Sequence, residues 1–213
     1  MEENEIPDLN VFMMCEKINK DAYKELPAGY KIRKLKRTEL KLWFGFPFDE
    51  PKDKVTHLGF MQTFYDNVYK KREDEFFNSC LVVCNKENKP IGTCFAWKAY
   101  EKFWTIHWYK INKECENKGL GRALLTEVMK TVPENELPIY LHTQPGSFRA
   151  IKIYSDFGFK ILKDKEIGNR ANNIKHAKKY LKYFMKDYYK DIKFAKSNGE
   201  LSRVAKMYSY NEF

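Results

Sequence analysis

The sequence predicts an α/β domain with a mixed, largely antiparallel central sheet flanked by helices. Strand-like segments at about residues 30–35, 80–85, 91–99 and 104–111 are partly joined by tight turns, which indicates an antiparallel meander. Helical and strand-like segments then alternate from residue 120 onward, which adds helices to the sheet. The 213 residues are 43% hydrophobic, enough for one buried core and too apolar for a disordered chain.

Each element follows from a local pattern. In 8–25, apolar residues recur at helical spacing after Pro7-Asp8, and Leu26-Pro27-Ala28-Gly29 follows. Pro133 stops the helix that precedes it. The full prediction is helices at 8–25, 38–43, 55–71, 120–132, 147–156 and 172–189, a loop at 45–53, and strands at 30–35, 80–85, 91–99, 104–111, 139–143, 158–162 and 192–195.

These elements predict three parts of the chain. Residues 1–29 form an added N-terminal helical extension, and residues 30–163 form the core domain. Residues 164–213 form a helical C-terminal extension with a long helix and a last strand, packed on the core.

Composition argues against several classes of protein. The longest apolar run, Val11–Cys15, is too short to span a bilayer, and the acidic start lacks the basic region of a secretory signal. We therefore expect a cytoplasmic protein without membrane contact. The five cysteines include no Cys-x-x-Cys pair and no His at ligand spacing, so we expect reduced thiols and no metal site.

The net charge of +10 does not by itself indicate a nucleic-acid partner. Most of the basic residues are Lys, whereas Arg is the better reader of bases and phosphates. The Lys-rich 160–196 segment has an apolar helical face, which indicates that its lysines form a solvated side. We expect no binding of nucleic acid.

The most informative segment is Glu116-Asn117-Lys118-Gly119-Leu120-Gly121-Arg122, between a strand and an amphipathic helix. Glycines let a ligand approach the backbone closely, and a helix start offers unpaired N–H groups at the positive end of its dipole. Lys113, Lys118 and Arg122 add positive charge. This combination predicts a pyrophosphate site, although a Gly pair before a helix is also compatible with a simple tight turn.

Two motifs together resemble the GNAT superfamily of acyl-CoA N-acyltransferases. The loop matches the family's Gln/Arg-x-x-Gly-x-Gly/Ala signature at its glycines and departs from it at the first position, where Glu116 replaces Gln/Arg. The family's Asn-x-x-Ala-x-x-x-Tyr-x-x-x-Gly-Phe block corresponds to Ser147, Ala150, Tyr154, Gly158 and Phe159. Tyr30–Arg33 matches the opening strand, so the resemblance covers about residues 30–163.

The resemblance implies a set of site residues. Those that would bind the acyl-CoA cosubstrate are Ile111, Asn117, Lys118, Gly119, Leu120, Gly121, Arg122, Ser147 and Ala150. Ser147 replaces an Asn that bonds the pantetheine arm, and it is equally compatible with a helix cap. The resemblance also implies a bulge in the fourth strand, whose backbone N–H groups at Tyr109 and Ile111 would serve the carbonyl and the pantetheine.

The chemistry of acyl transfer assigns the catalytic roles. An ammonium must lose a proton before it attacks a thioester, and the departing thiolate gains from protonation. Tyr154 matches the family's general acid. His107 matches a proton-accepting His of the arylalkylamine branch, and alternation places Thr105, His107 and Tyr109 on one face of their strand. His142, Glu101 and a water chain are the alternatives for the base.

The expected function is that of an N-acetyltransferase that moves the acetyl group of acetyl-CoA directly to a primary amine. No Cys/His pairing supports a covalent enzyme intermediate, although Cys115 lies near the loop. The alternative is a non-catalytic acyl-CoA-binding or sensing protein with the same fold. We expect a small-molecule acceptor rather than a protein, and a monomer or homodimer.

Overall fold

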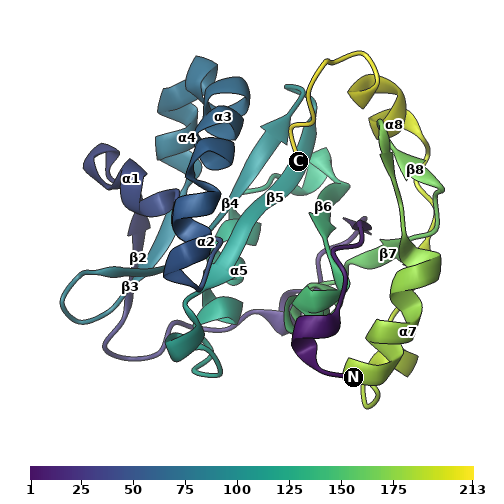
Figure 1. The fold of residues 1–213 in the computed structure, drawn as a ribbon, viewed down its shortest axis with the longest axis horizontal. Helices are drawn as coiled ribbons and strands as arrows, with labels where there is room; N and C mark the ends of the chain where they lie inside the picture. Colours follow the sequence, from purple (N-terminus) through teal and green to yellow (C-terminus); the bar gives the residue numbers. More distant parts are fainter. The chain divides into compact units, whose positions relative to one another are not determined.

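The computed structural model describes residues 1–213, apart from the side chain of Asn4. Its strands hydrogen-bond in the order β10-β7-β1-β6-β5-β4-β3-β2, and a separate hairpin pairs β8 with β9. The strands are β1 (Val11–Cys15), β2 (Lys31–Lys34), β3 (Leu81–Cys84), β4 (Pro90–Ala99), β5 (Phe103–Ile111), β6 (Ile139–Thr143), β7 (Lys160–Leu162), β8 (Glu166–Ile167), β9 (Arg170–Ala171) and β10 (Phe194–Ala195). The predicted mixed, mostly antiparallel sheet is thereby confirmed (Figure 1).

Eight α-helices accompany these strands in the described chain. They are α1 (Leu40–Trp43), α2 (Pro51–Thr56), α3 (Leu58–Val68), α4 (Glu73–Ser79), α5 (Leu120–Lys130), α6 (Phe148–Asp156), α7 (Ile174–Phe184) and α8 (Glu200–Ala205). Among these described helices, none has the length and apolar character needed to cross a bilayer.

The chain divides into two compact units. The first unit comprises residues 1–22, 98–105 and 133–213, and the second comprises residues 23–97 and 106–132. The end of β4, the turn after it and the start of β5 therefore belong to the first unit. The boundaries predicted at 29/30 and 163/164 stay a prediction.

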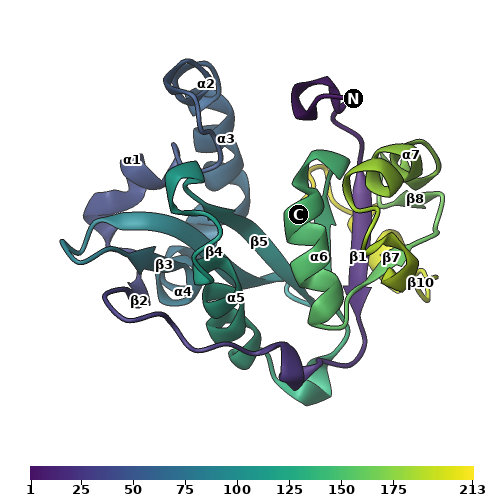
Figure 2. The ribbon, with the colours of Figure 1, turned by 90° about the horizontal axis from the view of Figure 1, so that it is seen from below.

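In the second unit, the strands β2, β3 and β4 pair antiparallel, with Ile32 opposite Val83 and Val82 opposite Thr93. The helix α5 lies on one side of these strands, and α2 and α3 lie on the other (Figure 2). The helix predicted at 55–71 is divided at His57, where α2 ends and α3 begins. Likewise, α2 begins at Pro51, inside the predicted 45–53 loop.

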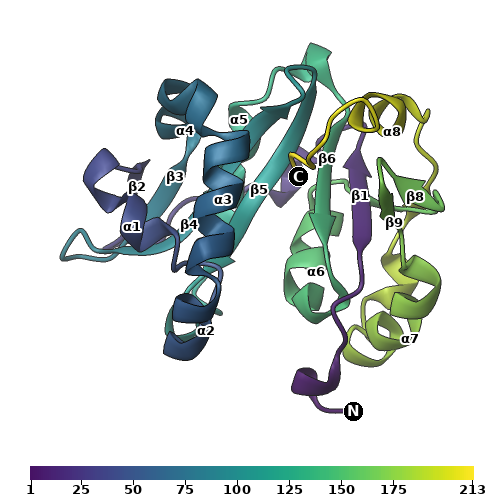
Figure 3. The same cartoon turned by 45° about the horizontal axis from the view of Figure 1, so that its top comes forward.

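In the first unit, β1 lies between β6 and β7 and pairs antiparallel with both. Figure 3 shows β1 beside β6. Met13 faces Leu141 on one side and Ile161 on the other. The helix predicted at 8–25 is therefore wrong, and so is the added N-terminal helix of the predicted fold. All five residues of β1 are buried, so Val11–Cys15 is a continuous apolar run of a central strand rather than one face of a helix.

The C-terminal part of the chain contains the predicted long helix and last strand as α7 and β10, although α7 covers only Ile174–Phe184 of the predicted 172–189. Ile174, Ala177 and Leu181 are the buried face of α7, as predicted for this amphipathic helix. The ring of Phe148 in α6 stacks on Phe184 of α7, with centroids 5.1 Å apart. The hairpin β8–β9 and the helix α8 were not predicted.

Candidate active site

The predicted phosphate-binding loop leads directly into α5. Asn117 and Gly119 both adopt left-handed backbone conformations, with φ of 60° and 78°. Gly119 is the N-cap of α5, and no described side chain caps this helix start. The first-turn N–H groups therefore face outward from a loop in which Asn117, Lys118 and Gly119 are exposed. This geometry suits an anionic ligand at the N-terminus of an eleven-residue helix.

The second glycine of the motif has a packing role. A Cβ built on Gly121 would lie 2.4 Å from the hydroxyl oxygen of Tyr109 and 3.3 Å from its Cζ. Burial raises the pKa of the Tyr109 hydroxyl, so the ring presents a neutral phenol beneath the first turn of α5. Tyr109 thus explains why the helix start has no side chain at residue 121.

Trp108 interrupts the alternation of β5. It adopts a left-handed conformation with φ of 49°, which is unusual for a bulky residue and lies where the bulge was expected. His107 packs on Phe95 of β4, whereas Tyr109 lies near Cys94, the residue before Phe95 in the same strand. Because adjacent strand residues point to opposite faces, the prediction that His107 and Tyr109 share a face is wrong.

His107 lies in an aromatic environment and is only 4% exposed. Its Nδ1 is 2.5 Å from the hydroxyl oxygen of Tyr69, and the indole N–H of Trp108 donates to the same oxygen at 2.9 Å. The ring centroids of His107 and Tyr69 are 5.8 Å apart. The predicted base is therefore part of a hydrogen-bonded group of three side chains.

The second motif lies in the first unit. Tyr154 is 5% exposed and its ring is tilted against Phe159, with centroids 5.8 Å apart. Ala150 lies one turn earlier on α6, and Ser147 precedes that helix. Ser147 makes no side-chain cap hydrogen bond to α6, so the capping alternative is wrong. Gly158 has φ of 101° and lies against the backbone of Lys17, which explains the glycine of this motif.

The two alternative candidates for the general base, His142 and Glu101, differ in their surroundings. His142 in β6 donates from Nε2 to Oδ1 of Asn10 at 2.9 Å. Burial, and then the charge of Arg170, lowers the pKa of His142 to about 3, so this imidazole accepts protons poorly. Glu101 is exposed in the turn between β4 and β5, where it has φ of 53°.

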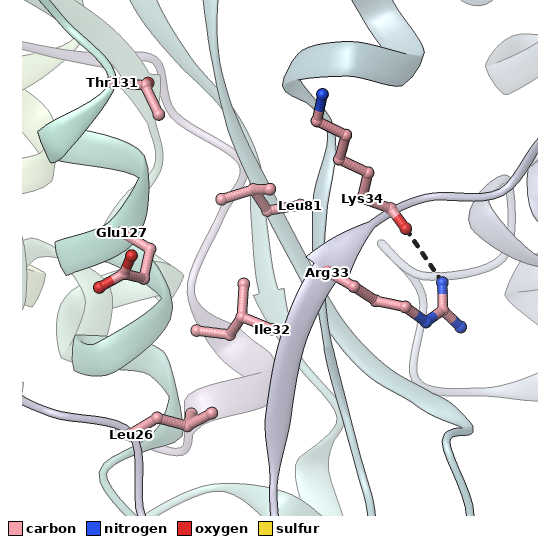
Figure 4. A pocket seen from close by; sticks show the side chains of 7 residues that line it. All are labelled: Leu26, Ile32, Arg33, Lys34, Leu81, Glu127 and Thr131. Carbon is pink, nitrogen blue, oxygen red and sulfur yellow. Dashed lines mark hydrogen bonds between the residues drawn. The ribbon is translucent and has the colours of Figure 1, made fainter.

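A surface pocket of the second unit lies away from the phosphate loop (Figure 4). Its lining includes Leu26, Ile32 and Leu81, together with Glu127 and Thr131 of α5. Glu127 is seven residues into a helix that rises about 1.5 Å per residue, so this pocket is roughly 10 Å from the helix start. Among the described residues, no cluster of His, Cys, Asp or Glu is arranged to hold a metal.

The loop before α5 and the second motif on α6 both lie within the residues that one family model matches. The sequence model of the acetyltransferase (GNAT) family matches residues 41–159. The chain belongs to this family of acyl-CoA-dependent acetyltransferases.

Several solved structures are similar to this chain at low sequence identity. A functionally unknown conserved protein from Staphylococcus epidermidis has a TM-score of 0.50 and 15% identity, covering 75% of this chain and 60% of that one. A GNAT-family acetyltransferase from Staphylococcus aureus has a TM-score of 0.44 and 19% identity, over 60% and 81% of the two chains. A GCN5-related N-acetyltransferase from Sphaerobacter thermophilus has a TM-score of 0.46 and 17% identity, over 76% and 51%. A comparison with curated proteins gave no match.

Two residues of the candidate site were not found from the sequence. Tyr69 follows α3 in a region without a recognisable motif, and only the fold brings it to His107. Trp108 is part of a strand whose residue types give no sign of a left-handed conformation. The family motif predicted a bulge in this strand, and Trp108 has a left-handed conformation there, but the motif did not indicate which side chains meet at that point.

Proposed function

We propose that the protein is an N-acetyltransferase that transfers the acetyl group of acetyl-CoA directly to a primary amine. The observation that carries this proposal is the helix start of α5, with an exposed left-handed glycine as its N-cap and first-turn N–H groups without a side-chain cap. A CoA pyrophosphate suits these donors. Lys113, Lys118 and Arg122 add positive charge around them.

The proposed chemistry follows from the demands of acyl transfer. An oxyanion forms when the amine attacks the thioester, and fixed N–H donors stabilise it. We assign these donors to the backbone of Tyr109 and Ile111, beyond the left-handed Trp108. On the family motif, Ser147 and Ala150 contact the pantetheine, and Tyr154 protonates the departing thiolate. His107 takes the proton of the acceptor amine.

The rival is a protein that binds acyl-CoA without turnover. Both hypotheses need the α5 start, but only the enzyme needs proton transfer at His107 and Tyr154. Release of CoA in the presence of an amine separates them.

Acetyl-CoA titration by calorimetry tests the binding half of the proposal. Gly119→Val places a β-branched residue at φ of 78°, which strains the loop, and it should abolish detectable binding. The matched control is Gly199→Val, because Gly199 is the N-cap of α8 with φ of 75° and similar backbone strain. Gly199→Val should bind acetyl-CoA like the parent. Equal affinity in a folded Gly119→Val variant would show that this loop does not bind the nucleotide.

A further inference from the structure

The hydroxyl of Tyr69 joins two side chains of β5. Its oxygen is 2.5 Å from Nδ1 of His107 and 2.9 Å from Nε1 of Trp108. The left-handed conformation of Trp108 makes this possible, because it brings two successive side chains of the strand to the same phenol. The indole of Trp108 and the imidazole of His107 therefore hydrogen-bond to the same oxygen.

The phenol has little freedom to move. Tyr69 has no exposed surface, and its ring stacks on Phe76 with centroids 4.9 Å apart. Trp97 and Phe95 meet the same ring edge-on at 5.0 Å and 5.5 Å. Such packing fixes the direction of the C–O bond and therefore the geometry at His107.

The chemistry of the three groups sets the direction of the hydrogen bonds. An indole nitrogen can only donate, so Trp108 donates to the phenol oxygen. A phenol is a stronger donor than an imidazole N–H, and an imidazole nitrogen is a stronger acceptor than a phenol. The short contact is therefore O–H of Tyr69 donating to Nδ1 of His107. The proton of the neutral imidazole then lies on Nε2, and the lone pair of Nδ1 faces the Tyr69 hydroxyl.

We propose that Tyr69 and His107 accept the proton of the acceptor amine together, as a relay. This proposal rests on the proposed function. An N–H bond of the ammonium breaks, directly or through one water molecule, and an O–H bond forms on Tyr69. The original O–H bond of Tyr69 breaks and an N–H bond forms at Nδ1 of His107. The phenol ends neutral, the imidazole ends as imidazolium, and the amine keeps the lone pair that attacks the thioester.

Trp108 lies between the solvent and the two residues of this relay. It is half-buried, whereas Tyr69 and His107 are buried, so the indole is the member of the group that reaches the surface. Its N–H donates to the phenol oxygen, and an amine or a water that takes the place of this N–H would reach that oxygen.

Tyr69→Phe tests the relay, because it keeps the ring and deletes the hydroxyl. We expect kcat to fall about 10²-fold, with acetyl-CoA affinity unchanged within about twofold. The matched control is Tyr65→Phe. Tyr65 is 4% exposed in the same aromatic cluster, but its hydroxyl donates to Glu73 at 2.7 Å. This control should keep the parent's kcat, and a fully active Tyr69→Phe would overturn the relay.

A double-mutant cycle separates the relay from a packing effect. If the two residues act as one unit, Tyr69→Phe should lower kcat less than about threefold in a His107→Ala background. Losses that multiply in full would show that the residues act separately, which also overturns the relay.

The hydrogen-bond direction has its own test, which needs no acceptor. Nitrogen-15 correlation spectra of the full chain, with His107 assigned by comparison with His107→Ala, should show the neutral ring protonated at Nε2. A ring protonated at Nδ1 would overturn the relay. A parent protein that acetylates no amine would instead overturn the proposed function, whichever nitrogen carries the proton.

Discussion

At the scale of single residues, the site depends on close contacts that a motif does not display. The second glycine of the loop motif would usually be assigned to the approach of a ligand. Here the hydroxyl of Tyr109 occupies the space that a side chain at residue 121 needs. The glycine is thus required by the protein's own packing as well as by the proposed nucleotide.

This contact predicts a rescue. Gly121→Ala should lower the free energy of unfolding by about 1–3 kcal/mol, because the new Cβ would lie 2.4 Å from the Tyr109 oxygen. Adding Tyr109→Phe removes that oxygen and should restore part of the loss, since the remaining Cζ contact is 3.3 Å. Urea unfolding of the two single variants and the double variant measures this. If the changes in unfolding free energy of the two single variants simply add in the double variant, the contact with Tyr109 is not what excludes a side chain at residue 121.

Prediction from the sequence gave mixed results for single residues. The loop, Tyr154 and His107 were assigned because their residue types occur at family spacing, and their roles stay predictions. The face of Tyr109 was predicted wrongly, because one left-handed residue, Trp108, reverses the alternation that sequence reasoning assumes. Tyr69 carries no local signal, since its role depends on a contact across 38 positions of sequence.

At the scale of elements, β6 holds an imidazole that should affect stability. The pKa of His142 is lowered to about 3, so the folded protein keeps it neutral while the unfolded chain protonates it below about pH 6.5. Its contribution to stability is therefore present above about pH 6.5 and is lost as the pH falls towards 3.

His142→Gln tests this pH dependence, because Gln keeps an N–H donor for Asn10 and does not titrate. Between pH 6.5 and 4, the parent's free energy of unfolding should fall more steeply than the variant's, by up to about 1.4 kcal/mol per pH unit. Urea unfolding at several pH values measures both slopes. Equal slopes would mean that His142 titrates alike in the folded and unfolded states.

The turn before the phosphate loop provides a chemical probe. Cys115 ends the short 3₁₀ helix Lys113–Cys115 and is half-buried, whereas the other four cysteines are buried. Burial raises the pKa of Cys15 and Cys80 to about 12, which keeps these thiols protonated and unreactive.

A thiol reagent should therefore modify the native protein first at Cys115, and acetyl-CoA should slow that reaction. Peptide mapping identifies the residue, and Cys115→Ser should remove the fast phase. Fast labelling at Cys80 or Cys94, or a rate at Cys115 that saturating acetyl-CoA leaves unchanged, would argue against this placement of the nucleotide.

Several elements were predicted with nearly the observed bounds. The strand β6 has the predicted bounds, and β4, β5 and α5 differ by one or two residues. The exception is β1, since an apolar run of five residues fits a buried strand as well as one face of a helix. Its two partner strands lie more than 120 residues away, so only tertiary pairing decides between these alternatives.

At the scale of the whole molecule, family membership fixes the type of reaction, whereas the acceptor is a matter of proposal. The net charge of +10 is partly carried by lysines on the solvated side of α7, opposite its buried face. This pattern gives no reason to assign the charge to a nucleic-acid partner.

The proposed function requires that the protein transfers an acetyl group and does not merely bind its donor. The most direct measurement follows CoA release from acetyl-CoA with a panel of primary amines, together with mass spectrometry of the amines. We predict CoA release matched by one acetylated amine, and a loss of about 10²-fold in kcat for Tyr154→Phe, which keeps the ring and deletes the proton donor. Tight binding of acetyl-CoA without CoA release for any amine, or a fully active Tyr154→Phe, would contradict the claim.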